Sequence, residues 1–251
     1  MKGIVLAGGK GTRLRPVTRV VNKHVLPVYD EPVVFYPIRT LLSAGIDEIL
    51  VISNAEHIGK YMELLETSFD ADFSYMVQSE PKGIAHAVGM AEEFVDDEFV
   101  VVLGDNVLFG DASPAIREFE ASDARAKIFL TRVEEPSAYG IAAVEDGVVT
   151  DLREKPESAD SDRAIIGLYC YTDDVFDVID GLAPSDRGEY EITDVNAHYL
   201  EAGDLDHTTF DGAWFDVGTP EGLFEASRYV AERGGEKPGL SVPAVGPTDA
   251  R

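Results

Sequence analysis

The stretch Leu6-Ala7-Gly8-Gly9-Lys10-Gly11-Thr12-Arg13-Leu14 decides the fold, and it follows directly on the apolar run Gly3-Ile4-Val5-Leu6. The apolar run predicts a buried first strand, and the glycines predict a sharp loop at its carboxyl end. Glycines leave backbone N–H groups free to face an anion at close range, because no Cβ stands in the way. Arg13 adds a fixed cation two residues past the last glycine. The stretch therefore predicts a loop that holds a triphosphate.

Two better-known phosphate loops do not fit this sequence. A Walker A loop needs serine or threonine after the lysine, but Lys10 is followed by Gly11. A dinucleotide fingerprint needs a further glycine three places after Gly11, and Leu14 stands there. A tight strand-to-helix turn without a ligand remains the alternative, because glycine is the default residue of any sharp turn.

Apolar runs alternate with helix-like segments along the chain, which predicts an α/β, Rossmann-like three-layer fold with a central mixed, mainly parallel sheet. The expected strands are 3–6, 48–52, 73–77, 99–103, 128–133, 140–144 and 165–171. The expected helices are 33–44, 84–94, 114–121, 173–179, 192–201 and 220–233, the last with Thr219 as N-cap and Pro220 at its first position. We expect one folded domain over 1–233 and a flexible tail rich in glycine and proline over 234–251.

The net charge of −26, from 47 acidic and 21 basic residues, excludes some partners. Such a field repels nucleic acid and anionic membranes, so we expect neither as a partner. A surface adapted to high cytoplasmic salt would explain the scattered acids, because salt screens their mutual repulsion; an acidic mesophilic protein is the alternative.

Several features indicate a cytoplasmic protein. No apolar run approaches the ~20 residues of a membrane span, and the N-terminal run is too short for a signal peptide. The single cysteine, Cys170, can form no internal disulfide, and its apolar surroundings favour a buried structural thiol.

Polar residues follow several predicted strands, where ligands of open α/β sheets bind. Gln78, Pro81 and Gly83 follow the third strand, and Asp105 follows the most apolar one. Asp216 lies between apolar neighbours. An aspartate in such a place either caps a turn or holds a divalent ion, and Mg2+ suits a pair of carboxylates beside phosphates. Taken alone, Lys23 and Lys155 are better explained as solvated surface residues and Arg187 as a partner of its acidic neighbours, and the five histidines lack metal-site spacing.

Taken together, the segments resemble the sugar-1-phosphate nucleotidylyltransferases, most closely the short glucose-1-phosphate thymidylyltransferases. The likeness covers roughly positions 1–230. Besides the glycine loop, the segments that carry it, in order, are Lys23 with 26–30, Gln78 to Ala85, 103–106, Tyr139-Gly140, Glu154-Lys155-Pro156, 167–169, 187–196 and 214–219.

The resemblance implies a role for each of these residues. The nucleotide would contact Leu6, Ala7, Gly8, Gly9, Gly11, Thr12, Arg13, Gln78, Pro81, Gly83 and Asp105. The sugar phosphate would contact Tyr139, Gly140, Glu154, Lys155, Gly167, Tyr169, Arg187 and Trp214. Arg13, Lys23 and Asp105 would be catalytic, and Asp105 with Asp216 would hold Mg2+.

The implied reaction transfers a nucleotidyl group from dTTP or UTP to glucose 1-phosphate and releases pyrophosphate. Two other assignments stay open: a sister enzyme that prefers UTP or another sugar 1-phosphate, and a non-catalytic subunit that binds sugar nucleotides. Glu31 and His86 replace a lysine and a glutamine that are common in the long members. Those members also continue into C-terminal helices that build a regulatory site, and the body predicted here ends near Arg233. A homo-oligomer is expected from the resemblance alone.

Overall fold

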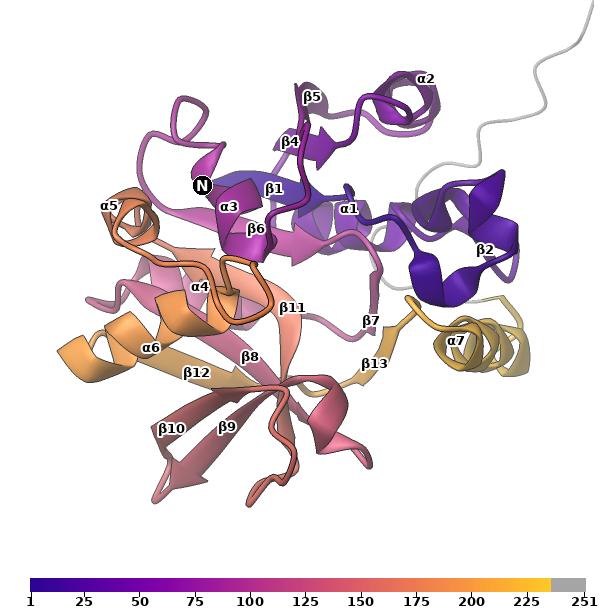
Figure 1. Cartoon of the computed structure of the whole chain (residues 1–251). Coiled ribbons are helices and arrows are strands. Elements are labelled where there is room, and N and C mark those ends of the chain that lie inside the picture. The colour runs from indigo at the N-terminus through magenta and orange to yellow at the C-terminus, as the bar shows by residue number, and fades with distance from the viewer. Residues whose placement is uncertain (236–251) are drawn as a thin grey trace, which may run out of the picture.

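A nine-stranded mixed sheet forms the centre of the molecule (Figure 1). This computed structural model describes residues 1–235. The strand order is β10-β9-β11-β6-β1-β4-β5, with β8 beside β11 and β12 beside β8. The strands are β1 Lys2–Leu6, β4 Glu48–Ser53, β5 Asp72–Val77, β6 Phe99–Leu103, β8 Ala126–Arg132, β9 Gly140–Glu145, β10 Val148–Glu154, β11 Arg163–Tyr171 and β12 Leu205–Thr209. Strands β5, β4, β1 and β6 pair in parallel, whereas β11 runs antiparallel to β6. The predicted α/β class and mixed sheet are confirmed.

Helices cover both faces of the sheet, because successive side chains of a strand point to opposite faces. In β6, Val101 belongs to one core cluster, and Val100 and Val102 belong to the other. The first cluster takes in α3, α5 and α6, and the second takes in α1, α2 and α4. Their bounds are α1 Phe35–Ser43, α2 Ile58–Glu66, α3 Ile84–Gly89, α4 Ser113–Glu120, α5 Val175–Asp180 and α6 Ile192–Ala202. A continuous apolar strand such as β6 is therefore buried on both sides.

A smaller unit lies beside the sheet and carries Asp216 to it. It combines the strand pair β7 Asn106–Phe109 and β13 Ala213–Asp216 with the hairpin β2 Pro27–Val28 and β3 Glu31–Pro32 and with the helix α7 Pro220–Glu232. Figure 1 shows α7 next to β2, and Tyr29 N donates to Ser227 Oγ at 3.1 Å. The Thr219 hydroxyl caps α7 by accepting from Gly222 N at 3.0 Å, which confirms the predicted start of this helix.

Some predicted elements differ from the observed ones. The helix predicted over 84–94 is wrong in length, because α3 ends at Gly89. Gly89 packs against Ile179 of α5, where a Cβ would stand 3.0 Å from Ile179 Cγ2. The required glycine weakens the helix at that point. The prediction also missed α2, β2, β3, β7, β10, β12 and β13. Most of these strands are short or only half-buried, so no long apolar run marks them.

Three further expectations concern particular segments. Cys170 is fully buried, as predicted, and burial raises the pKa of its thiol. The predicted flexible tail lies, from residue 236 onward, outside the described residues. Within the described part of the chain, no helix is both long and apolar enough to cross a membrane.

Candidate active site

A cavity of about 660 Å³ opens at the carboxyl ends of β1, β5 and β6. It brings together nearly every site residue predicted from the sequence. Those that line it are Leu6, Gly8, Gly9, Thr12, Arg13, Lys23, Gln78, Pro81, Gly83, Asp105, Tyr139, Gly140, Glu154, Lys155, Gly167, Tyr169, Arg187, Trp214 and Asp216. Residues from positions 6 to 216 thus converge on one hollow.

Ala7 and Gly11 shape the glycine loop without lining the cavity. Ala7 is buried, its N–H donates to Ile52 O at 2.8 Å, and its carbonyl accepts from Ser53 Oγ at 2.9 Å. Gly11 has a φ of 59°, a left-handed conformation that favours glycine, and precedes the short 3-10 helix Thr12–Leu14. The two residues anchor the loop at its two ends.

Arg13, Asp105 and Asp216 surround a single point. A Cβ placed on Gly218 would meet Arg13 Nη2 at 2.8 Å, Asp216 Oδ1 at 2.9 Å and Asp105 Oδ2 at 3.2 Å. Arg13 Nη2 also lies 3.5 Å from Asp216 Oδ2. The pairing of β7 with β13 creates this arrangement, because it places Asp216 opposite Asn106, next to Asp105. The guanidinium predicted to hold phosphate is therefore beside the two carboxylates predicted to hold a metal.

Lys23 forms an ion pair with Asp105 inside this group. The side chains of Lys23 and Asp105 are only 12% and 14% exposed. Burial alone would raise the pKa of Asp105, but the Lys23 charge, the neighbouring His24 and hydrogen bonds to the carboxylate together hold that pKa well below its usual range. Burial and the nearby Asp105 carboxylate raise the pKa of Asp216. The cation therefore keeps Asp105 ionised, as a metal ligand must be.

A network of buried polar side chains holds the short segment that carries Lys23. Asn22 Oδ1 accepts from the His24 backbone N–H at 2.8 Å and from Tyr61 Oη at 2.9 Å, and it lies 2.9 Å from His24 Nδ1. Burial and the neighbouring Lys23 charge lower the pKa of His24 to about 3, so the ring is neutral. The network fixes the short 3-10 helix Lys23–Val25 under the glycine loop. A Cβ on Gly9 would stand 2.9 Å from Lys23 Nζ, so Gly9 leaves room for the ammonium.

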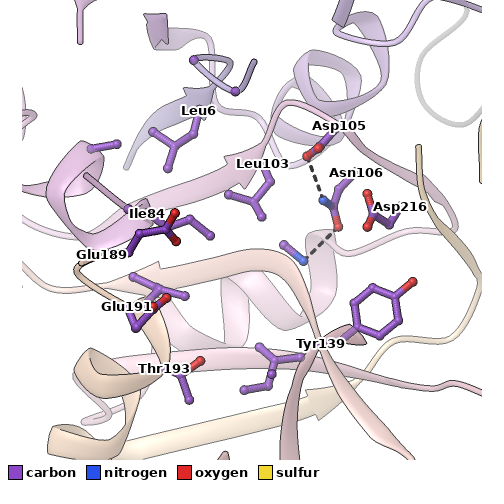
Figure 2. Close-up of a pocket in the computed structure, with 18 of the residues that line it drawn as sticks. Leu6, Ile84, Leu103, Asp105, Asn106, Tyr139, Glu189, Glu191, Thr193 and Asp216 are labelled. Atoms are coloured by element: carbon purple, nitrogen blue, oxygen red, sulfur yellow. Dashed lines mark hydrogen bonds between the residues drawn. The ribbon is translucent and has the colours of Figure 1, made fainter. Parts of the chain in front are cut away.

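Asn106 links the two halves of the cavity. Its Oδ1 accepts from Gly167 N at 3.0 Å and from Trp214 Nε1 at 2.5 Å, and its Nδ2 donates to Asp105 Oδ1 at 3.4 Å. Figure 2 shows the hydrogen bond between Asn106 and Asp105. The Trp214 indole therefore makes a hydrogen bond within the site in addition to its packing contacts. Asn106 belongs to the segment 103–106 that carries the family resemblance, but the sequence alone did not predict a role for it. Its position directly after Asp105 was the available signal.

Charged pairs fill the side of the cavity predicted to take the sugar phosphate. Arg187 Nη2 lies 3.1 Å from Glu154 Oε1 and 2.8 Å from Glu191 Oε1. Lys155 Nζ lies 3.0 Å from Glu154 Oε1, and Thr193 Oγ1 donates to Glu154 Oε2 at 2.7 Å. Burial alone would raise the pKa of Glu154, but the Thr193 hydroxyl and Lys155 lower it on balance. The sequence analysis gave no separate role to Glu191 or Thr193, which line the cavity from the start of α6 (Figure 2).

Gly83, one of the residues predicted to contact the nucleotide, is required by backbone packing. Its φ of 107° is strained for any other residue, and a Cβ there would lie 2.4 Å from Tyr190 O. Ala85 N donates to that same carbonyl at 3.2 Å. Besides its predicted contact with the nucleotide, Gly83 therefore packs against the segment that carries Arg187.

The donors present suit a hard divalent cation that keeps some positions for a substrate. Among residues 1–235, no group of three or more histidine, cysteine or acidic side chains is arranged to hold a metal. Asp105 and Asp216 supply two carboxylates beside Arg13. Mg2+ commonly takes one or two carboxylates and completes its shell with phosphate oxygens and water.

The fold and this site define an α/β protein whose main cavity brings a pair of carboxylates together with several cations. The chain belongs to the nucleotidyl transferase family, because the sequence profile of that family matches residues 2–233. It is 44% identical, over 92% of its length, to the low-salt glycan biosynthesis nucleotidyltransferase Agl11 of Haloferax volcanii, of which it spans 66%. It is 40% identical, over 92% of its length, to the glucose-1-phosphate thymidylyltransferase of Neisseria meningitidis, of which it spans 82%.

Solved structures show the same relationship. A Bacillus anthracis protein assigned as a glucose-1-phosphate thymidylyltransferase and solved in complex with sucrose has a TM-score of 0.87 and 40% identity. The match covers 91% of this chain and 94% of that one. A UDP-glucose pyrophosphorylase solved with UDP-glucose has a TM-score of 0.81 and 26% identity, and the match covers 92% of this chain and 98% of that one.

One departure noted in the sequence has a local explanation. Glu31 forms a two-pronged ion pair with the buried Arg39 of α1, with Arg39 Nη2 lying 2.8 Å from Glu31 Oε1. The Glu31 carboxylate therefore compensates the positive charge of Arg39, which would otherwise be buried among apolar neighbours without a counter-charge.

Proposed function

We propose that residues 1–233 form a catalytic domain that transfers a nucleoside monophosphate from dTTP or UTP to glucose 1-phosphate and releases pyrophosphate. The observation that supports this most is the convergence of Arg13, Lys23, Asp105 and Asp216 on one cavity. The relatives named as glucose-1-phosphate thymidylyltransferases support the choice of substrates. The homo-oligomer expected from the resemblance stays a prediction.

The proposed reaction needs positioning and charge compensation more than proton transfer. The attacking phosphate oxygen of the sugar 1-phosphate is already an anion at neutral pH, so no general base is required. The chain must hold two anions close together and stabilise the charge that develops on the phosphoryl oxygens. The loop amides and Arg13 would bind the triphosphate, and Lys155 and Arg187 would hold the sugar phosphate.

Mg2+ would bind to Asp105 and Asp216 and, when bound, act as a Lewis acid on the phosphoryl oxygens. Before a metal binds, Lys23 forms an ion pair with the Asp105 carboxylate. The ammonium lies next to the glycine loop, where a triphosphate would also bind it. Lys23 thus compensates the charge of the Asp105 carboxylate in the free protein, and it would contact phosphate in the complex.

The sugar-phosphate cations are also paired in the free protein. Glu154 and Glu191 hold Arg187, and Glu154 also holds Lys155. A bound phosphate would draw these cations toward itself, and Glu154 would then accept hydrogen bonds from sugar hydroxyls. The carboxylates therefore keep the cations in place, and they favour a ligand with hydroxyl donors.

The nucleotide preference provides the test. With glucose 1-phosphate and Mg2+, we expect kcat/KM for dTTP and UTP to exceed the values for CTP and GTP by at least ~10-fold. The reason is that a pocket with hydrogen-bonding groups rejects a base that leaves them unpaired. A higher value for GTP than for dTTP and UTP would contradict the proposed choice of nucleotide. A series of sugar 1-phosphates with the preferred nucleotide separates glucose from other sugars.

A subunit that only binds sugar nucleotides is the alternative of another class. It would show tight binding of a sugar nucleotide without pyrophosphate release from any nucleotide. The retention of Arg13, Lys23, Asp105 and Asp216 in one cavity favours catalysis, because binding alone does not require a metal-holding carboxylate pair.

A further inference from the structure

Lys23 bonds to the oxygen of Asp105 that faces the second carboxylate. Asp105 Oδ1 accepts from Asn106 Nδ2 at 3.4 Å (Figure 2), whereas Asp105 Oδ2 accepts a hydrogen bond from the Lys23 ammonium. The same Oδ2 lies 3.2 Å from the position that a Cβ on Gly218 would take, and Asp216 Oδ1 lies 2.9 Å from that position. Oδ2 is therefore the oxygen that would share a metal with Asp216, and the ammonium already bonds to it.

The four charged groups of this cluster balance one another. Besides the ion pair of Lys23 with Asp105, Arg13 Nη2 lies 3.5 Å from Asp216 Oδ2. The formal charges of two carboxylates and two cations sum to zero. A divalent cation that entered alone would bring excess positive charge among side chains that are largely shielded from water, which is strongly unfavourable. A triphosphate that entered with the metal would remove this excess, because it is an anion.

Lys23 has little freedom to turn into water and make room for a metal. Its side chain is only 12% exposed, its backbone belongs to the short 3-10 helix Lys23–Val25, and the buried Asn22 side chain caps that helix. The ammonium lies against the glycine loop, because a Cβ on Gly9 would stand 2.9 Å from Nζ. A phosphate group bound at that loop is therefore a partner that can take the ammonium from Asp105 without movement of the backbone.

We propose that Lys23 closes the Asp105 carboxylate to divalent cations in the free protein, so that the metal binds together with the triphosphate and not before it. The inference rests on the proposed function, because it concerns the order in which the same cavity takes the metal and the nucleotide. It assigns Lys23 a second role besides contact with phosphate. The free protein would bind a divalent cation weakly, and it would bind a triphosphate even without a metal.

Binding of Mn2+ alone to the whole chain, without nucleotide, tests this proposal. Electron paramagnetic resonance of the free ion gives the dissociation constant. The titration is run in about 0.5 M KCl, because salt screens the exposed acidic surface far more than a buried pair. Lys23→Met has a side chain of similar length without the charge. We expect it to bind Mn2+ at least ~10-fold more tightly than the wild type, because the hydrogen bond of an ion pair no longer competes for the carboxylate.

Two control variants show where the gain arises. Lys155→Met removes the same charge from the same cavity, but Lys155 pairs with Glu154 rather than with Asp105. Its affinity for Mn2+ should stay within about twofold of the wild type, because salt screens a more distant charge. The double variant Lys23→Met/Asp105→Asn should lose the gain. Unchanged affinity in Lys23→Met, an equal gain in Lys155→Met, or a gain that persists in the double variant overturns the proposal.

Binding of metal-free dTTP, measured in EDTA, separates this role from a merely structural one. We expect Lys23→Met to bind metal-free dTTP at least ~10-fold more weakly than the wild type, because a charge-assisted hydrogen bond to phosphate is lost. A variant with a damaged site would bind both ligands more weakly. The proposal requires a gain for Mn2+ and a loss for dTTP, so a loss for both contradicts it.

These binding measurements are independent of the proposed reaction. If no nucleotide is turned over, the proposed function fails, and the affinities for Mn2+ and dTTP still decide the role of Lys23. If turnover is found but Lys23→Met binds Mn2+ no more tightly, the proposed function stands and this inference fails. Should Lys23→Met fail to fold, Lys23→Gln keeps a polar end without the charge, and the same two changes are expected.

Discussion

Arg13→Ala lowers kcat for the proposed nucleotidyl transfer by at least ~100-fold, while the free energy of unfolding changes by no more than about 0.5 kcal/mol. The loss is large because a positioned cation acts on charge that develops in the transition state, where deletion of a single donor costs ~100-fold to ~1000-fold. The stability change is small because the Arg13 side chain is 57% exposed and its contact with Asp216 is long, at 3.5 Å. Steady-state kinetics and urea unfolding measure the two quantities.

Arg19→Ala is the matched control for Arg13. Arg19 lies in the next short 3-10 helix, Val17–Arg19, and is exposed outside the cavity. Its replacement removes the same charge from the same segment and should leave kcat within about twofold. Equal losses in the two variants would mean that Arg13 contributes only to the general field of the protein, which would remove it from the mechanism.

Asp105→Asn lowers kcat by about 1000-fold, which corresponds to about 4 kcal/mol of transition-state stabilisation. The amide preserves the shape of the side chain and its contact with Asn106, but it removes the charge that would hold Mg2+. Titration with Mn2+ in the presence of dTTP, followed by electron paramagnetic resonance, should show at least ~10-fold weaker metal binding.

Asp211→Asn controls for the loss of a carboxylate near the same strand pair. Asp211 is exposed just before β13 and does not line the cavity. We expect unchanged kinetics and unchanged Mn2+ binding. Wild-type metal affinity in Asp105→Asn would show that the ion, if one binds, does so elsewhere, and the assignment of Asp105 would then be wrong.

Local patterns of the sequence predicted the fold class and the glycine loop, whereas most of the other residues that line the cavity were implied by the family resemblance. Phe99–Leu103 is apolar without interruption and could only be a strand buried on both faces. Gly8 and Gly9 mark the loop directly, and both line the cavity.

The sequence could not predict the distances within the site. Asp105 and Asp216 come together through the pairing of β7 with β13, and neither short strand carries a long apolar run. The contacts of Asn106 with Gly167 and Trp214 join segments far apart in the chain. The packing of Gly83 against Tyr190 likewise depends on tertiary structure, which a local pattern does not contain.

The central proposal is that the cations of the cavity and the pair Asp105 and Asp216 bring two anionic substrates together. Pyrophosphate release from dTTP tests this proposal most directly. We expect release only when glucose 1-phosphate and Mg2+ are both present, in amounts equal to the sugar nucleotide formed. Omission of either component, or removal of the metal with EDTA, should abolish it. Absence of pyrophosphate with dTTP, UTP, CTP and GTP and every sugar 1-phosphate offered would show that the protein does not catalyse the proposed nucleotidyl transfer.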